Sequence, residues 1–480
     1  MSGVRVQVPT ALRPMVDGRA EVEADGATVA DVLEAVVRDR PRLGAFLFVS
    51  PRTVRSSVAV FVNDVDMRQR EREATPLRPG DVLTIVPILA GGRDDGPPEK
   101  PESFSAAELH RYSRHLLLPE VGIAGQRRLR AGKVLVVGAG GLGSPAAIYL
   151  AAAGVGTLGL VDFDRVEASN LQRQILYGTR DIGRPKLEAA RDRLTDLNPD
   201  VTVRLHPERL DRSNAREVIG AYDVVVDGTD NFATRYLVND AAVLLGRPNV
   251  YGSIYRFEGQ ASVFDARRGP CYRCLYPEPP PPGLVPSCAE AGVLGVLPGL
   301  IGTIQAAETV KLLLGRGETL VGRLLLFDAL AMRFRELSLT ANPQCVLCGP
   351  EATQKDLVDY PAFCGRGAEE EPGAAVPEIS AEELAAILSG TDGPLLVDVR
   401  EAEEWAIAHL PGALHIPQGD LGERLSELTG ARELVIYCKS GRRSAAASRR
   451  LRDLGFTRVR SLKGGIDAWT EEVDPTLPRY

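Results

Sequence analysis

The feature that most limits the fold of this chain is a glycine-rich turn between a buried strand and a helix. The strand is the apolar run at 133–137, and the turn at 138–143 reads GAGGLG. An alanine-rich helix is predicted over 144–153, and the next strand ends at Asp162. A strand, a G-x-G-x-x-G turn, a helix and an acidic residue about 20 positions later are typical of a Rossmann-type α/β domain. Its glycines, Gly138, Gly140, Gly141 and Gly143, let the backbone approach a phosphate-bearing ligand.

By itself this motif favours a nicotinamide or flavin enzyme, which is the main alternative function. Other polar residues favour a triphosphate, because cations can neutralise its phosphates and an acid can hold Mg²⁺. These residues are Asn170 and Arg173 in the segment 169–174, Lys186 at a helix start, Asp230 and Asn231 after an apolar strand, and Arg111 and Arg114 ahead of the Rossmann strand. The alternative for Arg111 and Arg114 is a solvated helix face.

Two seams rich in Gly, Pro and charge, at 91–101 and 365–377, divide the 480 residues. The length suits about three domains of roughly 150 residues. The first block has a strand at 4–8, a helix capped by Thr28, strands at 59–64 and 81–87, and the diglycine Gly91-Gly92. We therefore predict an α+β β-grasp domain at 1–92, a linker at 93–104, an α/β domain at 105–350, a linker at 351–377 and a second α/β domain at 378–480.

The first block resembles the small ubiquitin-like sulfur carriers of molybdopterin, thiamine and cysteine biosynthesis. The resemblance rests on the segments Val62-Asn63, 77–81 (LRPGD) and 88–92 (ILAGG). A tail without side chains is thin and flexible enough to enter a narrow active site. An isolated diglycine could simply begin a linker, but its place directly after the last strand favours a carrier tail.

Four cysteines form the pattern C-x-x-C…C-x-x-C, which is typical of a tetrahedral zinc site. They are Cys271, Cys274, Cys345 and Cys348. The five histidines lie outside both pairs, so the predicted ligands are all thiolates, and a closed set of four predicts a structural metal. A redox pair or a chance pattern is the alternative.

Residues from about 105 to 349 resemble the E1-like adenylyltransferases that serve sulfur carriers. The resemblance implies that Arg114 crosses a homodimer interface into the partner's nucleotide site and that zinc binds the four cysteines. It also implies that Cys288 is a second thiol, which resolves an acyl disulfide, although its sequence context suits an ordinary buried cysteine equally well. The implied ATP contacts come from Gly141, Asp162, Asn170, Arg173 and Lys186, with Asp230 positioning Mg²⁺ and Asn231 lining the same site.

The third block carries a buried strand at 394–400, the segment HLPGALHIP at 409–417, and a strand at 434–437 that leads into a cysteine loop. In these features it resembles a single rhodanese domain. Backbone N–H groups and a helix N-terminus around a cysteine stabilise its anion and that of its persulfide. The loop consists of Cys438, Lys439, Ser440, Gly441, Arg442 and Arg443, whose arginines add positive charge for an anionic donor. A phosphatase-type loop, Cys-x5-Arg, is the alternative, but only four residues separate Cys438 from Arg443, and this shorter loop suits sulfur over phosphate.

Together the three resemblances predict a sulfur-carrier adenylyltransferase that is also a sulfurtransferase. The expected partners are a ubiquitin-like carrier, a sulfur donor such as thiosulfate or a cysteine desulfurase, and a second subunit. One feature departs from the carriers, because Gly92 is joined to Arg93 by a peptide bond. Either a protease cuts after Gly92, or the attached block mimics a bound carrier while others are served in trans. A scaffold without turnover is the non-enzymatic alternative.

Composition limits the partners and the cellular compartment that we expect for this protein. The formal charge is 57 − 64 = −7, which argues against a general affinity for nucleic acid. The sequence offers no long uncharged apolar stretch and no apolar signal-peptide core, so we expect no membrane association. Seven cysteines in a chain of this size suggest metal ligands and nucleophiles in a reducing, cytoplasmic compartment, with Cys364 a linker residue. The pathway that receives the sulfur stays open.

Overall fold

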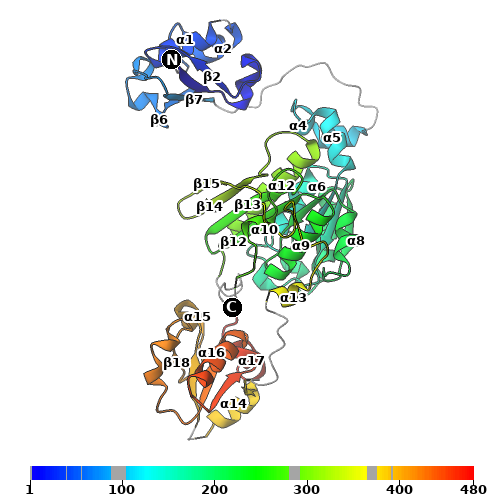
Figure 1. The fold of residues 1–480 in the computed structure, drawn as a ribbon, viewed down its shortest axis with the longest axis vertical. Coiled ribbons are helices and arrows are strands. Elements are labelled where there is room, and N and C mark those ends of the chain that lie inside the picture. The colour runs from blue at the N-terminus through cyan, green and yellow to red at the C-terminus, as the bar shows by residue number, and fades with distance from the viewer. Residues whose placement is uncertain are drawn as a thin grey trace. The chain divides into compact units, whose positions relative to one another are not determined.

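The computed structural model describes residues 3–38, 40–55, 57–87, 104–280, 292–364, 376–390 and 393–480. Gly91, Gly92, Cys288, most of the first expected linker and residues 365–375 of the second lie outside these ranges. The three folded parts are drawn in Figure 1. Within the described ranges, no helix is both long and apolar enough to cross a membrane.

The N-terminal part is a five-stranded sheet in the order β2-β1-β7-β5-β6, with β1 and β7 parallel and the other pairs antiparallel. Alternation of apolar and polar residues along the strands favours this sheet, since Val4 and Val6 are buried while their neighbours are exposed. This is the predicted β-grasp. Its main elements are β1 (Val4–Gln7), β2 (Glu21–Ala24), α1 (Val29–Val37), α2 (Pro41–Leu47), β5 (Val58–Val62), β6 (Val65–Asp66) and β7 (Val82–Pro87), with a small ribbon of β3 (Phe48–Ser50) and β4 (Thr53–Val54).

The middle part contains an eight-stranded sheet in the order β10-β9-β8-β11-β12-β13-β14-β15, whose first five strands are parallel. This is the predicted Rossmann-like domain extended by an antiparallel half. The strands are β8 (Lys133–Val137), β9 (Thr157–Val161), β10 (Thr202–His206), β11 (Val224–Asp227), β12 (Asn249–Tyr255), β13 (Glu258–Phe264), β14 (Arg323–Asp328) and β15 (Arg333–Ser338). The described helices are α3 (Ala106–Arg111), α4 (Ser113–Leu116), α5 (Gly122–Ala131), α6 (Gly143–Ala152), α7 (Lys186–Leu197), α8 (Ala215–Gly220), α9 (Phe232–Leu244), α10 (Tyr272–Leu275), α12 (Val296–Leu314) and α13 (Tyr360–Phe363).

Strand register brings three loops to one edge of this sheet. Val137 at the end of β8 pairs with Val161 of β9 and with Asp227 of β11. The glycine turn, the loop that starts at Asp162 and the turn before α9 therefore leave the sheet side by side. Helix α12 packs against α6, close to the glycine turn (Figure 1).

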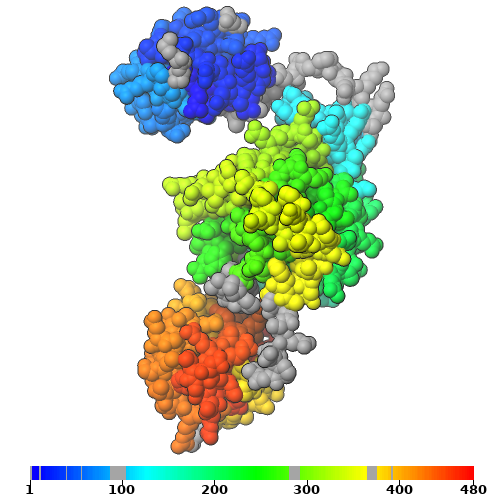
Figure 2. Space-filling view, in the orientation of Figure 1, coloured from blue at the N-terminus to red at the C-terminus, as the bar shows by residue number. Residues whose placement is uncertain are grey.

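Residues 351–364 were expected to begin a linker, but they pack on the middle domain. In Figure 2 this segment appears as yellow atoms against the green body of the domain. Tyr360 is buried and its hydroxyl donates a hydrogen bond to Asp240 on α9, at 2.8 Å. Cys364, expected in the linker, lies against the same core. Apolar and hydrogen-bonded contacts of this kind do not form in a solvated linker, so the folded domain extends past the second cysteine pair.

Asp240 is the centre of a buried polar cluster that ties this segment to α10. Its carboxylate accepts hydrogen bonds from Arg273 at 2.8 Å and from Gln354 at 2.8 Å, besides that from Tyr360. The side chains of Arg273 and Asp240 are 3% and 0% exposed, so each depends on the other for compensation of its charge.

The C-terminal part is a parallel five-stranded sheet in the order β16-β20-β19-β17-β18, which is the predicted rhodanese-type α/β fold. Its core contains a fully buried ion pair between Asp398 and Arg400. The elements are β16 (Glu378–Ile379), α14 (Ala381–Leu388), β17 (Leu395–Asp398), α15 (Ala402–Ile407), β18 (Leu414–His415), β19 (Leu434–Tyr437), α16 (Arg442–Asp453), β20 (Val459–Leu462) and α17 (Gly465–Glu472).

Replacing Asp240 should destabilise the middle domain because the Arg273 guanidinium would remain buried without a counterion. We expect Asp240→Ala to cost about 3–5 kcal/mol. The control Asp356→Ala removes an exposed partner of Arg216 and should cost under about 1 kcal/mol. Calorimetry of the full chain measures both, and equal melting temperatures for the two variants would contradict the assignment.

Candidate functional site

The glycine turn at 138–143 is built by close backbone packing. Gly138 has φ of 90°, which side chains rarely adopt. A Cβ on Gly143 would lie 1.8 Å from the Gly138 carbonyl oxygen, so no other residue fits there. A Cβ on Gly140, in contrast, would meet its nearest described neighbour, the Gln174 amide nitrogen, at 3.7 Å. The protein's own packing therefore does not require glycine at 140, and the bare backbone there leaves space for a ligand.

Asp162 links the turn to the neighbouring loop. One carboxylate oxygen accepts a hydrogen bond from the Ala139 backbone N–H at 2.9 Å, and the other accepts from the Asp164 N–H at 2.9 Å. Each carboxylate oxygen has a second acceptor position. The side chain can therefore hold the loop and still bind a hydroxyl of a ribose.

Lys186 is the buried cation of this edge. Its side chain is 6% exposed, and its ammonium donates to the exposed Asp164 carboxylate at 2.9 Å. An ammonium has three donors, and the described residues give Lys186 this single carboxylate partner. A phosphate that approached this edge could use the remaining donors.

Asn170 and Arg173 lie on the loop that follows. Asn170 is buried, and its side-chain oxygen accepts from the Glu167 N–H at 3.4 Å. Arg173 donates to the Ser169 carbonyl at 3.0 Å, and its Cδ lies 3.7 Å from the position of a Cβ on Gly141. The guanidinium of Arg173 is thereby anchored next to the glycine turn.

Arg114 is exposed on α4. Among the described residues of this chain, no hydrogen bond or ion pair joins it to the nucleotide edge. Arg111, named with it from the sequence, donates to the Leu197 carbonyl at 2.9 Å and so fastens α3 to the end of α7.

Asp230 and Asn231 follow β11. Asp230 is exposed, whereas the Asn231 side-chain oxygen accepts from the Thr234 N–H at 3.0 Å and caps α9. Sequence reasoning assigned no role to Asp227, which is fully buried and accepts from the Thr229 hydroxyl and N–H. Burial raises the pKa of Asp227, against the opposing effect of Arg235. This carboxyl group shapes the turn that presents Asp230, and its only sequence signal is its place at the end of an apolar strand.

Two further side chains around the glycine turn received no role from the sequence. The Tyr177 hydroxyl donates to the Ala139 carbonyl at 2.8 Å and so helps to fix the conformation of the turn. Gln174 is buried, and its side-chain oxygen has no hydrogen-bond partner within the described part of the chain. An unpaired buried acceptor next to Gly140 suits a ligand that brings a donor.

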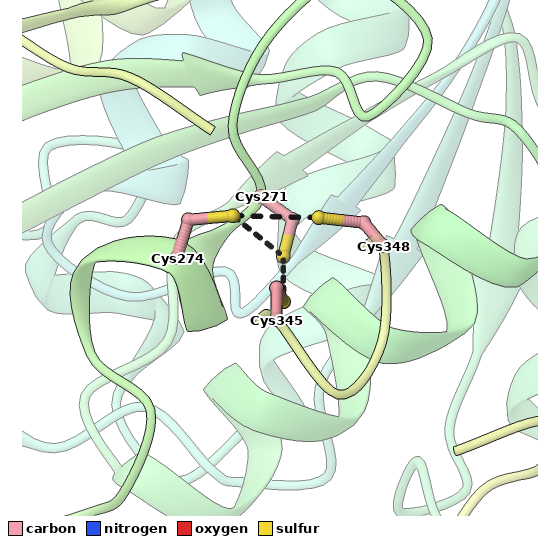
Figure 3. Close-up of side chains that lie close together, drawn as sticks. All are labelled: Cys271, Cys274, Cys345 and Cys348. Atoms are coloured by element: carbon pink, nitrogen blue, oxygen red, sulfur yellow. Dashed lines mark hydrogen bonds between the residues drawn. The ribbon is translucent and has the colours of Figure 1, made fainter. Parts of the chain in front are cut away.

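The four cysteines converge into one cluster (Figure 3). The sulfur atoms lie 3.9 Å apart for Cys271 and Cys274, 3.6 Å for Cys271 and Cys345, and 3.3 Å for Cys274 and Cys348. Zn–S bonds of about 2.3 Å in a tetrahedron place sulfurs about 3.8 Å apart, so the cluster fits one metal ion. Hydrogen bonds with Cys274 and Cys348, together with burial, raise the pKa of Cys271, so this thiol needs a cation nearby to ionise beside its neighbours.

In the C-terminal domain, Cys438 lies at the end of β19 and is buried. The backbone N–H of Ser444, in the first turn of α16, donates to its sulfur at 3.4 Å. Gly441 closes the loop with φ of 89°, and a Cβ there would press against the Gly464 N–H at 3.1 Å. The loop therefore holds a sulfur atom above a helix N-terminus, where an anion is stabilised.

The two arginines of the cysteine loop differ in exposure and in ion pairing. Arg442 is exposed, whereas Arg443 forms a two-pronged ion pair with Glu404 at 2.6 and 2.7 Å. Burial favours the neutral acid of Glu404, but Arg443 outweighs it and holds the pKa of Glu404 low. Sequence reasoning missed Glu404, because nothing in the spacing of α15 relates it to the loop.

A turn shaped for phosphate and a loop shaped for a sulfur anion occur here in one chain, and this combination defines an adenylyltransferase that also transfers sulfur. The family comparisons agree. Residues 112–347 match the ThiF family, 380–472 the rhodanese-like domain and 6–92 the ThiS family, so that the last match includes Gly91 and Gly92.

Three relatives illustrate the similarity. A probable adenylyltransferase/sulfurtransferase of Mycobacterium tuberculosis is 50% identical over 389 residues, which cover 80% of this chain and 98% of the relative. A sulfur carrier protein adenylyltransferase of Thermus thermophilus is 59% identical over 267 residues, covering 55% and 98%. An adenylyltransferase and sulfurtransferase of Aedes aegypti is 41% identical over 389 residues, covering 78% and 89%. The chain belongs to this adenylyltransferase/sulfurtransferase family of ThiF proteins, whose members use ATP.

A methyl group on Gly143 should displace the glycine turn. We expect Gly143→Ala to lower ATP-dependent pyrophosphate release at least about a hundredfold, because the backbone could no longer approach phosphate. Gly299→Ala on α12 is the matched control, since its Cβ would meet nothing described within 4 Å. A cooperative thermal unfolding transition of the middle domain would show that the Gly143 variant is folded. Normal ATP binding by that variant would contradict a nucleotide site at this turn.

Removing one thiol should empty the cysteine cluster. We expect Cys345→Ser to lose bound metal and to destabilise the middle domain, since a three-ligand site binds more weakly. Elemental analysis and thermal unfolding measure the two effects, and Cys364→Ser, which lies outside the cluster, serves as the control. A variant that kept one equivalent of metal would rule out this site.

Proposed function

We propose that this chain activates the C-terminal glycine of a ubiquitin-like sulfur carrier with ATP and then converts it to a thiocarboxylate with sulfur carried by Cys438. One observation supports this most strongly. A carrier-type domain whose family match runs through the diglycine is fused to both a ThiF domain and a rhodanese domain. We assign these parts to 1–92, 105–364 and 378–480, joined by linkers.

In the first step the carrier carboxylate attacks the α-phosphate of ATP, and pyrophosphate leaves. Lys186 and Arg173 neutralise phosphate charge, and Asp162 binds the ribose. We assign Arg114 to the nucleotide site of the partner in a homodimer. Its exposure supports this, as does the finding that no described residue of this chain's own nucleotide edge pairs with it. Asp230 would hold Mg²⁺, which offsets phosphate charge when bound.

In the second step Cys438 carries the sulfur. Its persulfide attacks the acyl-adenylate carbonyl, AMP leaves, and an acyl disulfide forms. A second thiol then attacks the Cys438 sulfur, which breaks the S–S bond and releases the carrier thiocarboxylate. We assign this thiol to Cys288; the resulting Cys288–Cys438 disulfide is then reduced by an external thiol. The donor would be thiosulfate or the persulfide of a cysteine desulfurase.

For the cysteine cluster we propose a structural zinc ion. Four thiolates match the ligand preference of zinc, and they leave no coordination position for substrate. Two of its ligands lie at α10, which follows β13, and two lie in the segment that follows β15, so the metal would stabilise the antiparallel half of the sheet.

The fused carrier needs one further event, because Gly92 is in a peptide bond with Arg93. An amide offers no carboxylate to adenylate. We propose that a protease cuts after Gly92, and that the separated carrier returns as substrate. Mass spectrometry of protein from its native host tests this, and finding full-length chain alone while the pathway runs would contradict it.

The decisive experiment supplies ATP, Mg²⁺ and thiosulfate to the full chain, together with a carrier made as residues 1–92. The expected product is a carrier whose mass increases by the difference between sulfur and oxygen. Nicotinamide binding without pyrophosphate release would favour a dehydrogenase instead. Absence of both activities would favour a scaffold.

If adenylation and sulfur transfer occur at separate sites, a single substitution should remove one activity and leave the other. We expect Asp230→Ala to lower pyrophosphate release about a hundredfold or more while thiosulfate sulfurtransferase activity stays unchanged. Cys438→Ala should abolish sulfur transfer and retain pyrophosphate release. Each variant is the control for the other, and loss of both activities in either one would contradict two independent centres.

A further inference from the structure

Lys439, the residue after Cys438, is held by an aromatic ring. Its ammonium lies 4.5 Å from the centroid of Tyr480, and its side chain is half-buried. Among the described residues, no carboxylate forms an ion pair with it. Asp467 is half-buried, and its backbone N–H donates to the Lys439 carbonyl oxygen at 3.0 Å. Burial raises the pKa of its carboxyl group, against the opposing charge of Lys439.

The position of Tyr480 is itself fixed. Its hydroxyl donates to Glu404 at 3.0 Å and accepts from Arg400 at 2.5 Å. Arg400 is held in turn by the buried carboxylate of Asp398. Burial raises the pKa of Tyr480, so the hydroxyl keeps its proton and can donate. The orientation of the ring over Lys439 therefore rests on the core of the domain.

Tyr480 contacts the start of the cysteine loop directly and is linked to its end through Glu404. Its ring lies against Lys439 at the start, and its hydroxyl binds Glu404, which pairs with Arg443 at the end. The charge of Arg443 is cancelled by that carboxylate, and the charge of the exposed Arg442 is screened by water. Lys439 is the half-buried cation of the loop, and no carboxylate of the described residues forms an ion pair with it.

The electrostatics of the Tyr480 ring explain how Lys439 can be held in place and still keep its charge. An aromatic face attracts a cation through its quadrupole but carries no net charge. It therefore orients the ammonium without neutralising it, which a carboxylate in the same place would do. Because Lys439 follows Cys438 directly, its charge stays within about one Debye length, roughly 10 Å, of the loop.

We propose that Tyr480 is a positioning residue that holds the Lys439 charge at the cysteine loop and so favours small anionic sulfur donors. This inference rests on the proposed sulfur transfer. With thiosulfate, the Cys438 thiolate attacks the outer sulfur, the S–S bond breaks, and sulfite leaves with the bonding electrons while a persulfide forms. Lys439 attracts the anion before the attack.

The test compares alkylation of Cys438 by anionic iodoacetate and neutral iodoacetamide in the full chain, followed by peptide mass spectrometry. The ratio of the two rates reports the local charge and does not depend on sulfur transfer. We expect Tyr480→Leu and Lys439→Gln to lower this ratio about three- to tenfold. Tyr480→Phe keeps the ring but loses the hydroxyl bonds that orient it, so its ratio should lie between those of the wild type and Tyr480→Leu. Arg452→Gln, at the far end of α16, is the matched loss of one charge and should have no effect.

Kinetics with thiosulfate give a second readout. Tyr480→Leu and Lys439→Gln should each raise KM about tenfold with little change in kcat, and the double variant should show no further loss. An unchanged alkylation ratio in Tyr480→Leu, or additive effects in the double variant, would overturn the inference. If wild-type chain transfers no sulfur but shows the expected alkylation ratios, the proposed function fails while the role of Tyr480 stands.

Discussion

Contact between backbone atoms of the glycine turn and its neighbours is the constraint on which the nucleotide edge depends. Gly143 and Gly228 both pack against the Gly138 carbonyl, with no room for a Cβ on Gly143. This contact draws the ends of β8 and β11 together, while hydrogen bonds from Ala139 and Asp164 to Asp162 add the end of β9. Three loops from distant parts of the sequence thereby form one surface of backbone N–H groups and cations suited to a phosphate chain.

The buried and half-buried charged groups are of two kinds: ion pairs that stabilise the fold, and cations that remain able to bind an anionic ligand. Arg273 with Asp240, Arg400 with Asp398 and Arg443 with Glu404 are cancelled pairs that hold elements together. Lys186 and Lys439 are cations that the protein positions without full neutralisation, one beside an exposed carboxylate and the other over an aromatic ring. A cation of the second kind can still attract an anionic substrate.

The sequence predicted the fold class and family correctly, because short motifs report local geometry. The glycine spacing predicted the turn, and the two C-x-x-C pairs predicted the cluster that the structure brings together. The roles of the individual ATP-site residues and of Cys288 remain predictions. The expected linker from residue 351 was wrong for 351–364, because its polar composition conceals the burial of Tyr360 against Asp240. Glu404 and Tyr480 went unassigned, since their partners are distant in sequence. Asp227 went unassigned because an apolar strand pattern does not show what the carboxyl group at its end bonds to.

By itself, the sequence determined three domains, a phosphate-binding turn, a four-thiol metal pattern and a nucleophilic cysteine loop. Each is encoded within a few neighbouring residues whose backbone conformation or ligand geometry leaves little choice. Only the tertiary structure decided which charges are cancelled and which stay available. That outcome depends on which side chains from separate elements come into contact where they are partly buried, as Glu404 does with Arg443 and Tyr480 with Lys439. No local sequence pattern specifies such contacts.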